Sequence, residues 1–355
     1  MKAYVVGGAV RDELLGLALK DKDYVVVGAT PEEMVAQGFK PVGKDFPVFL
    51  HPQTHEEYAL ARTERKSGRG YKGFTVHAAP DVTLEDDLRR RDLTINAMAK
   101  DPESGTLIDP FHGKQDLEKK ILRHVSGAFA EDPVRILRVA RFAARLGFRV
   151  ADETMQLMRE MVRSGEADYL VPERVWQEFE RGLAEPHPNK MFEVLEACGL
   201  ADKLLDGVKP VPEVLLKAAK LSRSVAVRFA VIAWPHKEPE VSAVCERLKA
   251  PNEVRELALL ACRSRVALRA APLATAAALL ELLKRADAFR RPERFRDLLE
   301  VARLGSPGLD TSRLERALAA AAAVDGGAIA ARAASPAEIP ALIDEERRRA
   351  IERGA

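Results

Sequence analysis

Residues 3–27, AYVVGGAVRDELLGLALKDKDYVVV, decide the fold at the start of the chain. A β-rich run ends at Gly7 and Gly8, a short helical stretch follows, and a second β-rich run carries Asp21 and Asp23. Side chains alternate between the faces of a strand, so the two aspartates are predicted to project from the same side. Two carboxylates that close repel each other unless a cation lies between them. Oxygen-only ligands suit Mg²⁺, which keeps water and phosphate oxygens in its other positions.

The glycine pair favours an anion next to those aspartates. Gly7 and Gly8 let the backbone approach a phosphate closely, and the N–H groups at the start of the following helix favour negative charge. Arg11, in the first turn of that helix, could reach the same phosphates. A lone Asp-x-Asp is more often a pair of surface turn residues, but the glycines and Arg11 upstream favour the catalytic interpretation.

The composition limits the class of protein. A chain of 355 residues exceeds the usual size of one hydrophobic core, so two or more domains are expected. Charged residues make up 31% and hydrophobic residues 47%, with a net charge of +2, which excludes a disordered, collagen-like, membrane-spanning or uniformly basic protein. The three cysteines are widely spaced, and no stretch approaches the roughly 18 apolar residues of a membrane span. We therefore expect a cytoplasmic protein without a membrane partner.

The pattern of the chain changes near residue 115. Before it, short β-rich runs alternate with Gly, Pro and charged residues, and one helical pattern covers Leu84–Met98. After it, nearly everything has a helical period, interrupted by Pro and Gly. We predict an α+β fold: a head with a small mixed sheet (residues 1–112), a helical neck (113–200) and a helical body and tail (201–355). The predicted strands are Ala3–Val6, Tyr24–Val27, Pro47–Leu50, Glu56–Ala61 and Phe74–Ala78.

The neck contains a run of arginines without acids. Between Pro133 and Val150 there are five arginines and no acidic residue. Pro133 suits the first position of a helix and Asp132 suits its N-cap. Unpaired cations on one helix face repel each other and favour an anionic ligand, either a triphosphate or an RNA backbone. A solvated face is the alternative, although such faces normally carry acids as well. The arginines that share this face are Arg135, Arg138, Arg141 and Arg145.

A second arginine cluster lies at residues 89–91. A helix would spread three adjacent side chains in different directions, so at most two of them can face one ligand. Asp92 and Asn96, four residues apart, would lie on the same side of that helix and could order an arginine or a sugar. A solvated charge run is the alternative.

These motifs together resemble a known family. GGAVRD at 7–12 followed by DKD at 21–23, RRDLTINA at 90–97 and EDPVR at 131–135 are similar to the signatures of the polymerase-β-like nucleotidyltransferases. More narrowly, they resemble the class II tRNA nucleotidyltransferases, or CCA-adding enzymes, and the related bacterial poly(A) polymerases. The resemblance is dense over residues 1–200. It implies a nucleotidyltransferase head, and addition of C, C and A to the 3′ end of tRNA from CTP and ATP with release of pyrophosphate.

The resemblance also implies roles for individual residues. Asp21 and Asp23 would hold two Mg²⁺ ions, with Glu57 as a supporting third carboxylate. Asp132 and Arg135 would hydrogen-bond the Watson–Crick edge of the incoming base: Arg donates to an acceptor and Asp accepts from the exocyclic amine, so C and A fit while U and G do not. The residues expected to position the nucleotide are Gly8, Arg11, Arg91, Arg138 and Arg141, with Asp92 and Asn96 in support.

One motif of the multifunctional members of this family is missing. They carry a C-terminal metal-dependent phosphohydrolase domain marked by a His-Asp pair, and the matching place here reads Trp234-Pro235. Neither residue ligates a metal, and His236 is the single histidine after Pro188. We expect no phosphohydrolase activity, and we expect residues 201–355 to be a degenerate remnant of that domain that holds tRNA.

Two alternatives to CCA addition stay open at this stage. Since the head motifs are shared, the chain could be a poly(A) polymerase or an enzyme that adds only CC or only A. It could also be a non-catalytic tRNA-binding protein that uses the basic neck.

Overall fold

The computed structural model describes residues 1–18, 22–42, 47–66, 74–222 and 224–354. The chain divides into two compact units, Met1–Lys203 and Leu204–Ala355. Within the described ranges, no helix has both the length and the apolar character needed to cross a membrane.

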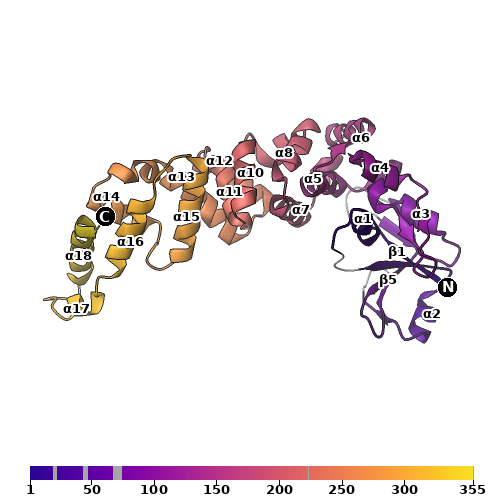
Figure 1. Ribbon diagram of the computed structural model, residues 1–355, viewed down its shortest axis with the longest axis horizontal. Helices are drawn as coiled ribbons and strands as arrows, with labels where there is room; N and C mark the ends of the chain where they lie inside the picture. Colours follow the sequence, from indigo (N-terminus) through magenta and orange to yellow (C-terminus); the bar gives the residue numbers. More distant parts are fainter. Residues whose placement is uncertain (19–21, 43–46, 67–73, 223, 355) are drawn as a thin grey trace. The chain divides into compact units, whose positions relative to one another are not determined.

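A seven-stranded mixed sheet forms the N-terminal part of the first unit, where Figure 1 labels β1 and β5. The strand order is β3-β4-β5-β2-β1-β8-β9; β2 and β5 pair in parallel and the other neighbours pair antiparallel. The strands are β1 (Lys2–Val6), β2 (Asp23–Val27), β3 (Lys40–Pro41), β4 (Val48–Leu50), β5 (Glu57–Leu60), β8 (Ala99–Lys100) and β9 (Leu107–Ile108). A separate antiparallel pair consists of β6 (Thr63–Lys66) and β7 (Phe74–His77).

Helices cover both faces of this sheet, and β2 shows why. Val25 and Val26 are adjacent on the strand, so they point to opposite faces, and each is buried. Val26 packs with Met34 of α2 (Pro31–Ala36) on one face. Val25 packs on the other face with Leu88 of α3 (Leu84–Arg89) and with Ala97, which follows the 3₁₀ helix η1 (Thr94–Asn96). A strand that is covered on both faces needs the continuous apolar run that β2 carries.

The rest of the first unit is mainly helical. Its remaining helices are α1 (Gly8–Leu14), α4 (Gly113–Lys119), α5 (Val134–Leu146), α6 (Asp152–Arg163), α7 (Pro172–Ala184), α8 (Pro188–Ala197) and α9 (Leu200–Leu205), with 3₁₀ turns η2 (Gly127–Glu131) and η3 (Glu166–Tyr169). Pro and Gly interrupt the helices as the sequence predicts: α5 lies between Pro133 and Gly147, and α7 and α8 begin at Pro172 and Pro188. The short strands β10 (Ile121–Leu122) and β11 (Arg149–Val150) pair in parallel. The neck, which we expected to be helical, therefore also contains two short strands.

The predicted helix over Leu84–Met98 is wrong beyond Arg89. The segment after α3 leaves the helix because it pairs with a distant strand-like segment: Leu93 forms a β-bridge with His124, and the Thr94 N–H donates to the carbonyl of Arg123 at 2.9 Å. These tertiary hydrogen bonds replace the helical ones, so the backbone groups remain satisfied without a helix.

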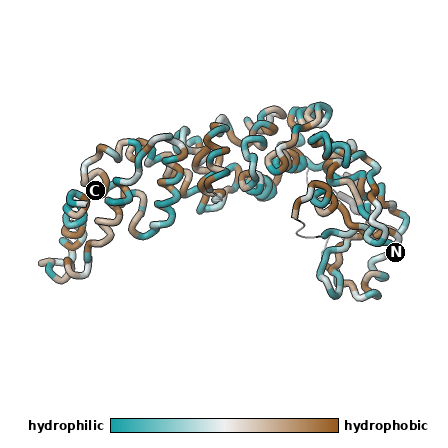
Figure 2. Tube along the Cα trace, viewed as in Figure 1, coloured by the Kyte–Doolittle hydropathy of each residue, from teal (hydrophilic) through white to brown (hydrophobic). Residues whose placement is uncertain are grey.

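Within the described residues, the second unit consists of helices and the turns between them. Its helices are α10 (Pro212–Leu221), α11 (Val225–Ala233), α12 (Glu238–Leu248), α13 (Asn252–Ala270), α14 (Ala276–Arg285), α15 (Pro292–Gly305), α16 (Ser312–Ala322), α17 (Gly326–Ala330) and α18 (Ile339–Gly354), with the 3₁₀ turn η4 (Ala271–Leu273). Hydrophobic and hydrophilic residues alternate within the turns of these helices (Figure 2), as expected where one side packs on a neighbour. The α+β head followed by helices is thus the fold that the sequence predicts.

Trp234, at the place of the missing His-Asp pair, belongs to the core of the second unit. Its side chain is 2% exposed. A Cβ atom added to Gly305 would lie 2.4 Å from the Cδ1 atom of Trp234, so the indole packs directly on the backbone of α15. The guanidinium of Arg269 lies 5.9 Å from the ring centroid. The position therefore contributes packing to the core, in place of a polar side chain.

Candidate active site

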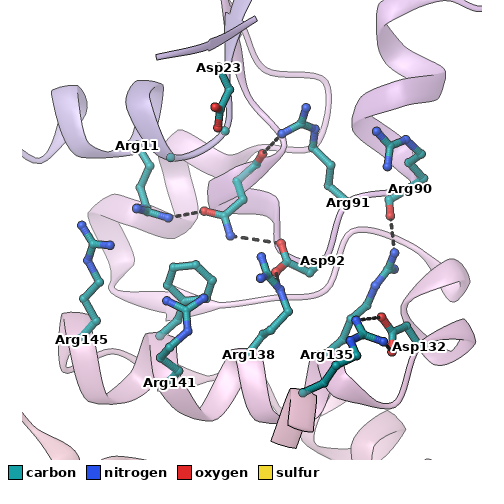
Figure 3. Close-up of a pocket in the computed structure, with 15 residues that line it drawn as sticks. Arg11, Asp23, Arg90, Arg91, Asp92, Asp132, Arg135, Arg138, Arg141 and Arg145 are labelled. Atoms are coloured by element: carbon teal, nitrogen blue, oxygen red, sulfur yellow. Dashed lines mark hydrogen bonds and ion pairs between the residues drawn. The ribbon is translucent and has the colours of Figure 1, made fainter. Parts of the chain in front are cut away.

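A cleft of about 520 Å³ lies in the first unit between the start of β2 and the helix α5. Asp23 and Arg11 lie on one side of it, and the arginines of α5 lie on the other (Figure 3). Ten residues to which the family resemblance assigns a role in the site line the cleft: Gly8, Arg11, Asp23, Arg91, Asp92, Asn96, Asp132, Arg135, Arg138 and Arg141. Five others line it too: Gly7, Arg90, Phe142, Arg145 and Arg174. Eight arginines and three aspartates give the cleft an excess of positive charge, which suits a polyanion.

The predicted metal ligands are only partly described. Asp21 lies outside the described residues. Asp23 is the first residue of β2, is exposed, and lines the cleft. Glu57 begins β5 and is paired in register with Asp23, so the two side chains project to the same face of neighbouring parallel strands. Among the residues that the structure describes, no group of three or more His, Cys, Asp and Glu side chains is arranged to hold a metal ion.

Gly7 allows an arginine to lie against the backbone. Its φ is +68°, and a Cβ atom added there would lie 2.8 Å from the Nη1 atom of Arg91. We expected the glycines to make room for a phosphate, and the structure adds a second reason for Gly7. The guanidinium of Arg91 therefore lies closer to this backbone than a residue with a side chain would allow.

Arg91 and Arg90 share one buried carboxylate, Asp87. The Asp87 oxygens lie 2.7 Å from Nη2 of Arg90 and 3.1 Å from Nη2 of Arg91. Burial by itself would raise the pKa of the Asp87 carboxyl, but the charges of the two arginines outweigh burial and hold that pKa below its ordinary value. Asp87, which the sequence did not single out, therefore orders Arg91, together with the carbonyl of Asn96, which accepts from Nη1 of Arg91 at 3.4 Å. Arg89 instead pairs with Glu85 in an exposed position.

Asp92 and Asn96 lie together, although not on a helix. The Nδ2 atom of Asn96 donates to Asp92 Oδ1 at 3.1 Å across the turn that leads into η1. Each then holds a different arginine: Asp92 binds Nε of Arg138 at 2.8 Å, and Asn96 accepts from Nη1 of Arg11 at 2.5 Å. Burial of Asp92 would raise its pKa, but the charge of Arg138 and the bond from Asn96 outweigh burial, so the pKa lies far below the ordinary range.

The arginines of α5 are not the unpaired run that the sequence predicted. Glu178 of α7, which is 6% exposed, lies 2.5 Å from Nε of Arg141 and 3.7 Å from Nη1 of Arg138. Asp12 of α1 binds Nη2 of Arg145 at 2.8 Å. The helix α5 has no acids of its own, and the carboxylates that pair with its arginines come from other elements of the first unit. Each carboxylate fixes the direction of a guanidinium, and the excess positive charge of the cleft remains.

Arg11 and Phe142 line the cleft side by side. Arg11 is 3% exposed, and this burial lowers the pKa of its guanidinium, while the adjacent Asp12 partly offsets the effect. Its guanidinium carbon lies 5.0 Å from the centroid of the Phe142 ring, and that of Arg141 lies 4.5 Å from the same ring. The aromatic ring thus spaces two cations from opposite walls and interacts favourably with both.

Asp132 and Arg135 lie at the start of α5. The helix begins at Val134, one residue later than expected, with Pro133 in the cap position, and Asp132 Oδ1 accepts from the Val134 N–H at 3.1 Å. The two terminal nitrogens of Arg135 donate to the carbonyls of Ala128 at 2.9 Å and Arg90 at 2.8 Å. These bonds fix the plane of the guanidinium. The two groups that the sequence predicts as base readers therefore share one end of the cleft.

The sequence did not single out Arg174, which lines the cleft, or Glu178, which holds two of the arginines that line it. Both lie on α7, four residues apart and therefore on one helix face. Arg174 binds Asp132 at 2.8 Å, and Glu178 binds Arg141 and Arg138. An arginine in the first turn of a helix opposes the helix dipole, so its presence there was a signal that it serves a partner outside the helix.

Two family models match parts of this chain. The model of the Poly A polymerase head domain matches residues 3–123, and the model of the probable RNA and SrmB-binding site of polymerase A matches residues 147–211. The Multifunctional CCA protein of Aromatoleum aromaticum is 53% identical over 99% of this chain and 98% of its own length. That alignment spans 399 positions, more than the 355 residues of this chain, so the relative contains segments that this chain lacks.

Solved structures of similar fold include two complexes. One is a CCA-adding enzyme with ATP, at a TM-score of 0.72 and 22% identity, covering 98% of this chain and 85% of the other. The other is the Thermotoga maritima CCA-adding enzyme complexed with tRNA, at a TM-score of 0.69 and 24% identity, covering 99% of this chain and 88% of the other. At these identities the likeness shows a shared fold.

Proposed function

This chain belongs to the family of the multifunctional CCA proteins, and on that premise we propose that it adds C, C and A in turn to the 3′ end of tRNA. The nucleotides come from CTP and ATP, and each addition releases pyrophosphate. The observation that carries the proposal is the cleft of eight arginines, with Asp23 on one side and the pair Asp132 and Arg135 at one end. Such a cleft can hold a triphosphate and read a base without a nucleic-acid template.

In the reaction, the terminal 3′-hydroxyl of the tRNA attacks the α-phosphorus of the nucleotide. A new O–P bond forms, the bond to the β-phosphate breaks, the hydroxyl proton passes to water, and pyrophosphate leaves with the developing negative charge. Arg91, Arg138 and Arg141 would hold that charge. Their directions are set beforehand by buried carboxylates, so little reorganisation is needed when the charge moves.

Magnesium is the cofactor that we propose, as two ions held by Asp23 and Asp21 with Glu57 in support. The donor set fits: the ligands are carboxylate oxygens, Asp23 is exposed in the cleft, and Glu57 is paired beside it. When bound, Mg²⁺ supplies positive charge that lowers the pKa of the attacking hydroxyl and stabilises the triphosphate.

Base selection follows from hydrogen-bonding capacity. An ionised carboxylate only accepts and a guanidinium only donates. Asp132 would accept from the exocyclic amine of C or A, and Arg135 would donate to the adjacent ring nitrogen. U and G present a carbonyl oxygen and an N–H at these places, so both contacts are lost. The two groups thus distinguish the pair C and A from the pair U and G.

Incubation with tRNA that lacks its CCA end tests the proposal. With Mg²⁺, CTP and ATP, denaturing gels and sequencing of the product are expected to show a three-nucleotide CCA extension. Asp23→Ala is expected to abolish extension while tRNA binding, measured by filter retention, remains. A folded wild-type protein that leaves the tRNA unextended would refute the proposal.

The second candidate is a poly(A) polymerase, which the match to a poly(A) polymerase head domain favours. The same assay separates the two, because a poly(A) polymerase makes a long tail of A from ATP alone. An enzyme that adds only CC or only A would stop after two nucleotides or one. A non-catalytic tRNA-binding protein would bind the tRNA and leave its length unchanged.

A further inference from the structure

Arg174 holds the carboxylate that we propose as a base reader. Its Nη2 atom donates to Asp132 Oδ2 at 2.8 Å and its Nη1 atom donates to Asp132 Oδ1 at 3.3 Å, so each terminal nitrogen binds one carboxylate oxygen. Asp132 Oδ1 also accepts from the Val134 N–H. Bonds from two directions, α7 on one side and the start of α5 on the other, therefore fix the plane of this carboxylate.

The position of Arg174 is costly for stability alone. It is the third residue of α7, where the helix dipole favours acids over cations. It also adds an eighth arginine to a cleft that is already strongly positive. Its side chain is 28% exposed and that of Asp132 is 15% exposed, so water screens the pair less than it screens a surface ion pair. What offsets the cost is the two-point contact with Asp132.

The orientation of Asp132 matters for selectivity. A carboxylate that is turned about its last torsion angle presents a different oxygen, or none, to the amine of an incoming base. A carboxylate held in one plane accepts from the amine of C or A, and it faces the carbonyl oxygen of U or G with electrostatic repulsion. Loss of a well-oriented contact of this kind weakens discrimination by roughly tenfold or more.

We propose that Arg174 is a specificity-determining residue, which positions Asp132 so that the cleft selects C and A against U and G. The inference rests on the proposed function and extends it by one residue. Arg174 acts through Asp132, so its role is that of a positioning residue.

The same helix offers a matched comparison. Glu178 lies four residues after Arg174 and contacts the arginines of α5 that we assign to the triphosphate. Every nucleoside triphosphate has the same phosphates. A change at Glu178 should therefore alter the use of all nucleotides by the same factor, whereas a change at Arg174 should alter their ratio.

The experiment measures kcat/KM for CTP and for UTP in single-nucleotide addition to tRNA that lacks CCA. Arg174→Met, which keeps length but removes the charge, is expected to lower the CTP:UTP ratio about tenfold. Arg174→Lys keeps the charge but loses the two-point contact, so its CTP:UTP ratio should lie between those of the wild type and Arg174→Met. Glu178→Gln should lower both values and keep the ratio. Arg163→Ala, an exposed arginine at the end of α6, serves as the unchanged control.

The outcomes separate this inference from the proposed function. A wild-type protein that does not extend tRNA refutes both. A wild-type protein that adds CCA, with Arg174 variants that fold and keep the wild-type ratio, refutes the inference alone. For variants that lose catalysis, the affinities for CTP and UTP are measured by displacement of a bound fluorescent nucleotide. An unchanged ratio of these two affinities also refutes the inference about Arg174. Melting curves of both variants show whether a uniform loss reflects unfolding.

Discussion

Replacing Asp92 by Asn tests whether buried carboxylates hold the arginines of the cleft. The substitution preserves shape, so it leaves no cavity. Asn can still accept from the Leu93 N–H and from Asn96, which lie 2.8 Å and 3.1 Å from Asp92 Oδ1. The ion pair with Arg138 is lost, and an amide donor can be left facing a guanidinium donor.

The expected loss is about 2–3 kcal/mol in the free energy of unfolding. Removing one partner of a buried ion pair costs roughly 3–5 kcal/mol. The side chain of Asp92 is 7% exposed, but that of Arg138 is 35% exposed and also lies 3.7 Å from Glu178, which reduces the loss. For a unit of this size, 2–3 kcal/mol lowers Tm by about 4–12 °C.

The assay must follow the first unit alone. The chain has two tryptophans, Trp176 in the first unit and Trp234 in the second. In a Trp234→Phe background, the fluorescence of the buried Trp176 reports on the first unit during heating. Glu85→Gln is the control, since it breaks an ion pair in which both side chains are 55% exposed, and it should change stability by less than about 1 kcal/mol.

A double substitution makes the test sharper. With Arg138→Met in the Asp92→Asn protein, the uncompensated cation is removed, so Tm should recover part of the loss. A Tm within about 2 °C of the parent for Asp92→Asn alone would refute the reasoning. So would a double variant that is less stable than the sum of the two single changes.

Three further predictions follow from the same contacts. The pKa values of Asp87 and Asp92 are lowered in the folded state, so both carboxylates stabilise the fold fully above the ordinary carboxyl pKa of about 4. This stabilisation is lost as pH falls towards the pKa values of the folded state. The Tm of the first unit should therefore drop steeply below about pH 4, and it should drop less in the Asp92→Asn variant. Gly7→Ala should displace Arg91 and raise KM for nucleotides several-fold. The control is Gly16→Ala, which also changes a glycine at positive φ but has no atom within 4 Å of the added Cβ, so KM should stay unchanged. Equal KM values in the two variants would count against a role for Gly7 in the site. The purified protein should release no phosphate from p-nitrophenyl phosphate, and it should not open 2′,3′-cyclic nucleotides to nucleoside monophosphates, when divalent metal ions are added. Metal-dependent turnover of either substrate would contradict our interpretation of the missing His-Asp pair.

Local patterns predicted the elements of the fold well. The strands around Val25 and Phe49 were found from their β-rich runs, and Pro and Gly marked the ends of α5 and the starts of α7 and α8. These signals are properties of neighbouring residues: a proline cannot continue a helix, and a buried strand needs an apolar run. The prediction failed after Arg89, where pairing with His124 took over the backbone bonds of the segment.

The sequence predicted which residues belong to the candidate site better than it predicted the ion pairs between them. Ten residues chosen from the sequence line one cleft, because each motif carries a charge or a glycine that its local pattern does not need. Their partners were not predictable from the motifs. Asp92 holds Arg138 across 46 positions of sequence, and Glu178 holds Arg141 across 37.

The sequence by itself determined which side chains we propose for the chemistry: Asp23 at the start of a strand, arginines on one helix, and an Asp-x-x-Arg pair at the start of that helix. Charge type, turn chemistry and periodicity are local, so they can be read residue by residue. Only the tertiary structure decided that the arginine face is held by acids from α1, α7 and the turn before η1. Ion pairs depend on distance in space, and the chain must fold before residues so far apart in sequence come within about 3 Å of each other.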